Sequence, residues 1–229
     1  MTVDDTAAET GRREADPGGG RTAPGGSTTP GGSTTARGPR SWRVDVERKD
    51  GVPRLVPHAE LARLISAALE AAGAPRPASI GLVLADDDML AALNATHMGK
   101  SGPTDVLSFP LLPPGAFPVQ PGAELPPNRA ATPAFALPPG RRLHLGDIVV
   151  SVERAIEQAG HGHGGQTGDV RWEAADELRL LVTHGALHIC GWDHSQPAEE
   201  AAMRRLERDL LENVLPGRRP GAARRRSPA

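Results

Sequence analysis

Tyrosine is absent from this chain of 229 residues, and other aromatic side chains are few, with three tryptophans and three phenylalanines. The single cysteine, Cys190, excludes an intramolecular disulfide and is typical of a reducing compartment, so we expect a cytoplasmic protein without a disulfide partner. No apolar run approaches the ~20 residues that cross a bilayer, and no apolar signal region follows a basic start. The sequence therefore predicts neither a membrane segment nor secretion.

Charge is unevenly distributed behind a net value of −2. Residues 1–40 hold five arginines and five acidic residues, and the tail from Pro216 holds five arginines and no acid. That leaves 16 basic and 23 acidic side chains in residues 41–215, a net charge of −7. Because phosphate neutralisation needs cations, a folded region this acidic is not an obvious nucleic-acid binder. Any RNA contact must therefore depend on a local patch or on the tail.

Glycine and proline divide the chain into a folded region and its extensions. Residues 1–40 repeat Gly-Gly-Ser-Thr-Thr and hold almost no large apolar residues, which predicts a disordered leader. Residues 41–215 are expected to form a single domain with flexible inserts at 111–142, rich in proline, and at 160–170, rich in glycine. Residues 216–229 are expected to be an arginine-rich disordered tail.

Apolar periodicity predicts an α+β fold, a small mixed sheet of about four strands with helices packed on it. The second half of the helix expected from Trp172 is apolar nearly all round, which is typical of a central buried helix. The expected strands are 42–48, 80–84, 104–109 and 144–152, and the expected helices are 57–72, 86 to about 94, a short one to about 159, 172 into the histidine-rich segment, and 197–214.

Three of the eight histidines fall within eleven residues. His184 and His188 are four apart, so they project from one face of that central helix. Gly191 can end the helix in a left-handed conformation, so that the chain returns and presents His194. Three converging imidazoles with an open fourth position are the ligand set of catalytic zinc, and we expect one Zn²⁺ per chain. A structural zinc would need a fourth protein ligand, commonly a cysteine, but we expect Cys190 to pack inward as a small apolar residue.

The same spacing occurs in zinc proteases with the motif His-Glu-x-x-His-x-x-Gly-x-x-His. Those enzymes use the glutamate beside the first histidine as the general base for the metal-bound water. The residue at that position here is Gly185, which has no group that transfers a proton. The pattern therefore predicts the metal geometry with a different hydrolysis, or with none.

Three blocks of sequence together resemble the YbeY family of bacterial zinc-dependent endoribonucleases, which are tied to ribosomal RNA maturation. The blocks are Thr-Asp-Val-Leu-Ser-Phe-Pro at 104–110, Leu-Gly-Asp-Ile at 145–148, and the histidine segment 184–194. The resemblance covers roughly residues 42–215. It implies a single-domain α+β fold in which the three histidines hold the zinc, cytoplasmic action on RNA, and ribosomal RNA, ribosomal subunits or ribosomal proteins as partners.

The loop before the first block is expected from the resemblance to face the metal cleft. The family typically has arginine, glycine and lysine in a row there, and this chain has Met98, Gly99 and Lys100. Lys100 is the candidate catalytic residue, as a phosphate contact, although a solvated loop lysine fits its charge equally well. Arg141, Arg142 or an arginine of the tail could take the place of the missing arginine.

Three aspartates and one serine complete the candidate site. Asp105, Asp147 and Asp193 could each hold the far nitrogen of a ligand histidine, or could cap turns. Ser108 could reach the cleft or pair within the sheet.

These observations predict a catalytic metallo-domain with the function of a zinc-dependent, single-strand-specific endoribonuclease of ribosomal RNA maturation. One alternative is a zinc hydrolase of another substrate, such as a peptide, and Gly185 counts against it. The other is a non-catalytic, zinc-stabilised ribosome assembly factor, which Met98 and the acidic charge of residues 41–215 favour.

Overall fold

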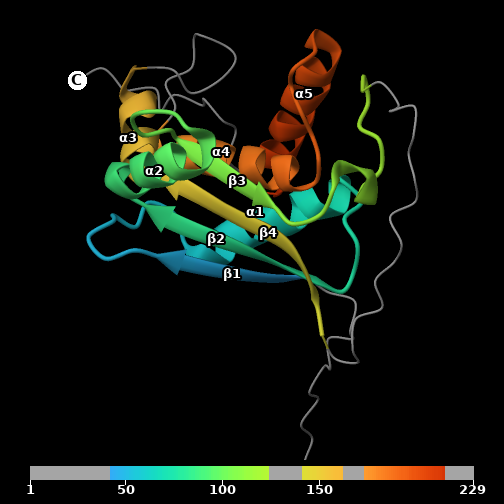
Figure 1. Ribbon diagram of the computed structural model, residues 1–229, viewed down its shortest axis with the longest axis horizontal. Coiled ribbons are helices and arrows are strands. Elements are labelled where there is room, and N and C mark those ends of the chain that lie inside the picture. The colour runs from blue at the N-terminus through green and yellow to red at the C-terminus, as the bar shows by residue number, and fades with distance from the viewer. Residues whose placement is uncertain (1–41, 124–140, 162–172, 215–229) are drawn as a thin grey trace, which may run out of the picture. The chain divides into compact units, whose positions relative to one another are not determined.

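The computed structural model describes residues 42–123, 141–161 and 173–214, and these form a sheet with helices on both of its faces (Figure 1). The predicted leader 1–40 and tail 216–229 lie outside the described residues.

The sheet has four strands, as the sequence predicted, in the order β1-β2-β4-β3. Strand β1 pairs in parallel with β2, β2 pairs in parallel with β4, and β4 pairs antiparallel with β3. The sheet is therefore mixed, and the α+β fold class is confirmed. The strands are β1 (Arg43–Arg48), β2 (Ala78–Ala85), β3 (Val106–Pro110) and β4 (Leu143–Ser151).

The five α-helices of the described residues occur where helical periodicity predicted them, with ends shifted by a few residues. They are α1 (His58–Ala71), α2 (Asp87–Leu93), α3 (Val152–His161), α4 (Ala174–Ile189) and α5 (Pro197–Val214). The segment after α2 is a π-helical turn, η1 (Asn94–Met98), which ends at Gly99 with a φ of +64°.

Helix α4 is the buried central helix that the sequence predicted. It packs against β3 and β4 on one face of the sheet, beside α1 and α3, while α5 packs against α1 and α4 (Figure 1). Its apolar side chains, including Leu178, Val182 and Leu187, belong to the main core. Because the core surrounds α4, histidines placed on it have a fixed backbone.

A smaller apolar cluster lies on the other face of the sheet. Leu90 of α2 packs there with Ala85, Leu107 and Val149. The side chain of Asp86 caps α2 by accepting a hydrogen bond from the backbone N–H of Met89.

The structure describes only the first part of the proline-rich insert expected at 111–142. Residues 111–123 are described and include the short 3-10 helix η2 (Pro114–Ala116). Phe117 is only 2% exposed within the main core, so apolar burial fixes this segment although proline blocks regular structure. The remainder of this insert, 124–140, and most of the second, from 162, lie outside the described residues.

Among the helices of the described segments, none has the length and apolar character needed to cross a membrane.

Candidate metal centre

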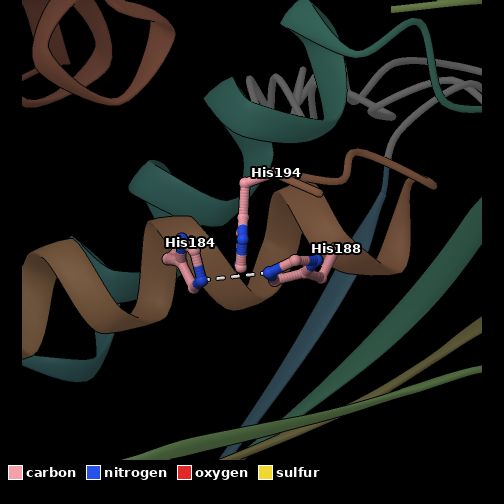
Figure 2. A group of neighbouring side chains, drawn as sticks. All are labelled: His184, His188 and His194. Carbon is pink, nitrogen blue, oxygen red and sulfur yellow. Dashed lines mark hydrogen bonds between the residues drawn. The ribbon is translucent and has the colours of Figure 1, made fainter. Parts of the chain in front are cut away.

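The end of α4 sets up the histidine cluster. Gly191 has a φ of +77°, and its N–H donates to the carbonyl of His188 at 3.0 Å. The N–H of Trp192 donates to the carbonyl of Leu187 at 3.1 Å, which completes a helix C-cap of the Schellman type. The left-handed glycine turns the chain back, as the sequence predicted, and the side chain of His194 then points toward His184 and His188 (Figure 2).

The three histidines converge on one point (Figure 2). One nitrogen from each of His184, His188 and His194 lies within 4.8 Å of the others. The Nε2 atoms of His184 and His188 are 3.0 Å apart, and the ring centroids of the three histidines are 4.4 to 5.5 Å apart. These three side chains therefore lie close enough to bind one metal ion.

The Nδ1 atoms of His184 and His188, which face away from the point of convergence, are both hydrogen-bonded. Nδ1 of His188 donates to the backbone carbonyl of Trp192 at 2.8 Å. Nδ1 of His184 lies 2.7 Å from the Oε1 atom of Glu207, which accepts its hydrogen. A carbonyl and a carboxylate only accept hydrogen bonds, so both Nδ1 atoms carry hydrogen and both Nε2 atoms present lone pairs in the neutral rings.

This arrangement fits a cation. Two lone-pair nitrogens at 3.0 Å repel each other unless a positive charge lies next to both. Since zinc binds imidazole nitrogen at 2.0–2.1 Å, two ligands of a tetrahedral ion lie about 3.3 Å apart. The 3.0 Å between the Nε2 atoms of His184 and His188 is close to this value, and a ring nitrogen of His194 lies within 4.8 Å of both histidines.

Burial holds His188 in the form that binds metals. Partial burial, followed by repulsion from the neighbouring His184 and His194, lowers the pKa of His188 from 6.5 to about 4. The imidazole is therefore neutral at neutral pH, as a metal ligand must be. Cys190 does not join the cluster, because its buried side chain belongs to the core, and burial raises the pKa of this thiol to about 12.

Two cavities open beside the histidines. The larger, of about 370 Å³, is lined by residues of β3, by Asp105 next to that strand, and by all three histidines. The smaller, of about 190 Å³, lies between the histidines and α5, and its lining is His184, His194, Glu200, Met203, Arg204 and Glu207. A ligand in either cavity can therefore reach the point on which the three imidazoles converge.

Comparisons with known proteins agree with this geometry. The family model described as endoribonuclease YbeY matches residues 46–215. A relative from Thermobifida fusca named endoribonuclease YbeY is 36% identical over 169 residues, covering 73% of this chain and 91% of the relative. Another of that name from Renibacterium salmoninarum is 38% identical over 172 residues, covering 75% and 92%.

The chain belongs to the YbeY family. A solution structure from Thermotoga maritima also aligns with 75% of this chain and 88% of that chain, at 20% identity and a TM-score of 0.45, values that add nothing to the assignment.

Lys100 does not join the histidines of this YbeY-family chain. It is exposed, and the described residues that line the two cavities do not include it. Its backbone is held through Asn94, whose carbonyl accepts from the N–H of Lys100 and whose amide donates to the carbonyl of Gly102 at 2.9 Å. Met98, at the position expected to hold arginine, is 45% exposed.

None of the three predicted aspartates holds the far nitrogen of a clustered histidine. Asp105 lines the larger cavity, but its carboxylate accepts from the N–H of Val106 at 2.8 Å and from Gln158 at 3.0 Å. Asp147 lies 3.2 Å from Nε2 of His144, which is not one of the three clustered histidines. Asp193 accepts from the N–H of His194, and this bond lowers the pKa of its carboxyl.

Ser108 and Gly185 show why α4 approaches the sheet so closely. The hydroxyl of Ser108 donates to the carbonyl of Gly185 at 3.1 Å, so this serine both lines the larger cavity and ties β3 to α4. A β-carbon on Gly185 would lie 2.7 Å from Cγ2 of Ile148 and 3.1 Å from Cγ2 of Val106. At the position that holds the glutamate in zinc proteases, a side chain would therefore clash with the sheet unless Ile148 shifts.

Sequence reasoning missed Glu207, which holds Nδ1 of His184 although it lies 23 residues further along. A signal was present, because Glu207 follows Met203 by four residues and precedes Leu210 by three, on the apolar stripe of α5. It is 2% exposed, and a carboxylate on a buried stripe indicates a buried polar partner.

Proposed function

We propose that this chain is a zinc-dependent endoribonuclease that cuts single-stranded RNA and acts in the maturation of ribosomal RNA in the cytoplasm, with residues 41–215 as its one catalytic domain. The observation that carries the proposal is the meeting of three imidazole nitrogens beside open cavities. The matching family model and the relatives named endoribonuclease YbeY support RNA as the substrate.

Zinc is the metal that this donor set supports best, because three imidazoles with an open position are the usual ligands of a catalytic zinc. When bound by His184, His188 and His194, it would supply a water of pKa about 7 and a Lewis acid for a phosphate oxygen.

The chain's own residues orient these ligands. Glu207 and the carbonyl of Trp192 keep the hydrogens of His184 and His188 on Nδ1, so that the Nε2 lone pairs face inward. Glu207 also places a negative charge against the far nitrogen of His184, which makes that ring a stronger donor to a cation. Loss of this contact would leave the ring free to turn.

The larger cavity offers space for the RNA chain next to the histidines. Ser108 lies in its lining with its hydroxyl directed to Gly185, and the carboxylate of Asp105 is held by Val106 and Gln158. These bonds keep the two polar side chains in place while nucleotides enter. The phosphate contact by Lys100 stays a prediction, for a nucleotide outside the cavity lining.

The test is cleavage of an unstructured, single-stranded oligoribonucleotide by purified protein, with and without chelator. We expect cleavage that chelator abolishes, that added zinc restores, and that His188→Ala lacks. Cleavage that survives chelator, or that is equal in His188→Ala, would show a contaminating nuclease or a different site. Casein in parallel tests peptide hydrolysis, which we expect to be absent because Gly185 leaves no space for the general base.

A non-catalytic ribosome assembly factor is the second candidate. The exposed Met98 and the net charge of −7 over residues 41–215 favour it, because they leave little positive charge for RNA. If zinc only holds the fold together, its removal by a chelator should lower the melting temperature of the protein sharply. We expect a modest decrease here, since α4 is already surrounded by the core without the ion.

A further inference from the structure

In the part of the chain that the structure describes, positive charge is scarce in the two cavities beside the histidine cluster. Of the described residues that line the two cavities, Arg204 is the only lysine or arginine. It lies in the smaller cavity with His184 and His194. An RNA strand that passes this point carries one negative charge per phosphate, and its binding requires cations on the protein.

Helix α5 holds Arg204 in a defined relation to the histidines. Arg204 precedes Glu207 by three residues, so both side chains project from neighbouring positions on the helix surface. Glu207 is bonded to Nδ1 of His184 at 2.7 Å, and this contact ties α5 to α4 at that level. The backbone of Arg204 is therefore fixed next to the three histidines.

Glu200, which also lines this cavity, holds the guanidinium in the free protein. Arg204 donates from Nη2 to Oε1 of Glu200, four residues earlier on α5. The two side chains are 47% and 42% exposed, and exposed ion pairs of this kind contribute little to stability. A phosphate can therefore take the place of Glu200 at small cost, and guanidinium binds phosphate through two parallel hydrogen bonds.

We propose that Arg204 binds a backbone phosphate of the RNA in the smaller cavity, one or a few nucleotides from the bond that is cut. This inference rests on the proposed function and adds a residue that determines how RNA lies across the site. Glu200 acts as the partner that the phosphate displaces.

The neighbouring Arg205 provides a matched control. It is exposed on the same helix, but it lines a separate groove with Trp192, Leu206 and Pro118. Arg204→Ala and Arg205→Ala remove the same charge one residue apart. Both variants lose one positive charge from the molecule. A difference between them in RNA binding therefore reports where on α5 the charge lies.

The experiment uses the full-length, zinc-loaded protein and a labelled single-stranded oligoribonucleotide. We expect Arg204→Ala to raise KM about tenfold, as for the loss of one charge-assisted contact, with bound zinc and melting temperature unchanged. The slope of log Kd against log salt should decrease by about 0.7, the value for one phosphate of a single strand. Arg205→Ala should keep the KM and slope of the unmodified protein, and Glu200→Gln should lower KM.

Equal effects of Arg204→Ala and Arg205→Ala, or a higher KM in Glu200→Gln, would overturn the role of Arg204 while the ribonuclease function stands. Unmodified protein that neither binds nor cuts the oligoribonucleotide would overturn both. Loss of zinc in Arg204→Ala would also contradict the inference, because it would place the residue in the support of the metal site.

Discussion

The Oε1 atom of Glu207 lies 2.7 Å from the Nδ1 atom of His184, and this contact joins the last helix to the central one. Glu207 is 2% exposed, and burial of a carboxyl group costs free energy unless a polar partner compensates for the lost water. A buried carboxylate against the far nitrogen of a histidine is the usual support of a metal ligand.

We therefore expect Glu207→Gln to lower zinc affinity about tenfold to a hundredfold, because an amide orients the ring without the negative charge. The measurement is competition with a zinc-binding dye. Glu212→Gln makes the same change at an exposed position of α5 and should leave affinity unaltered. Equal affinities in the two variants would refute a role for Glu207 in metal binding.

The cluster itself is tested by removing one imidazole at a time. His184→Ala or His188→Ala should lose bound zinc and RNA cleavage together, since two remaining imidazoles hold the ion weakly. His144→Ala removes a histidine that contacts Ser79 and Asp147 instead, and it should retain both properties. The zinc content of the purified proteins is measured by elemental analysis. A full zinc content in the double variant at positions 184 and 188 would show that these histidines are not the zinc ligands.

Gly185 allows α4 to lie against the sheet. An added β-carbon would approach Ile148 to 2.7 Å, so we expect Gly185→Ala to destabilise the protein by about 1–3 kcal/mol, the usual cost of overpacking. Gly160→Ala on α3 meets nothing within 4 Å and should be neutral or slightly stabilising. Urea denaturation of the two variants measures the difference, and similar midpoints would mean that the sheet yields to α4 at little cost.

Glu177 makes stability depend on pH. It is 3% exposed, its Oε2 has no hydrogen-bond partner among the described residues, and burial followed by the charge of Asp105 raises its pKa from 4.5 to about 7. Between pH 4.5 and about pH 7, Glu177 therefore holds a proton in the folded chain that it has released in the unfolded chain. This contribution to stability is complete below pH 4.5 and is lost as the pH rises through 7.

Glu177→Gln should therefore be more stable than the unmodified protein by about 2 kcal/mol at pH 8 and should show no such gain at pH 4.5. Both proteins carry the same histidines, so the difference in their free energies of unfolding isolates Glu177. Glu212→Gln, at an exposed position, should show no pH-dependent gain. A difference between Glu177→Gln and the unmodified protein that stays constant from pH 4.5 to 8 would contradict the raised pKa.

Several features were predictable because they depend on neighbours in sequence. The four-residue spacing of His184 and His188 places them on one face of any helix, and Gly191 favours the left-handed turn that ends it. Alternating and helical apolar patterns located the strands and the buried helix α4, because burial of apolar faces selects them. Membership of the YbeY family also followed from local blocks of sequence, and the family comparisons confirmed it.

The partners of these residues depended on how distant elements pack. Asp105, Asp147 and Asp193 were the plausible supports for a histidine by residue type, but the groups that occupy Nδ1 are the carboxylate of Glu207 and the carbonyl of Trp192. The latter is a backbone atom, which no choice of side chain encodes.

Local spacing thus sufficed to predict where three imidazoles could meet, because helix geometry and a glycine turn act over a few residues. The packing of α5 against α4 decided which charges lie beside them, Glu207 behind His184 and Arg204 in the cavity next to it. That packing results from apolar burial summed over the whole core, and it brings together residues that no short-range pattern connects.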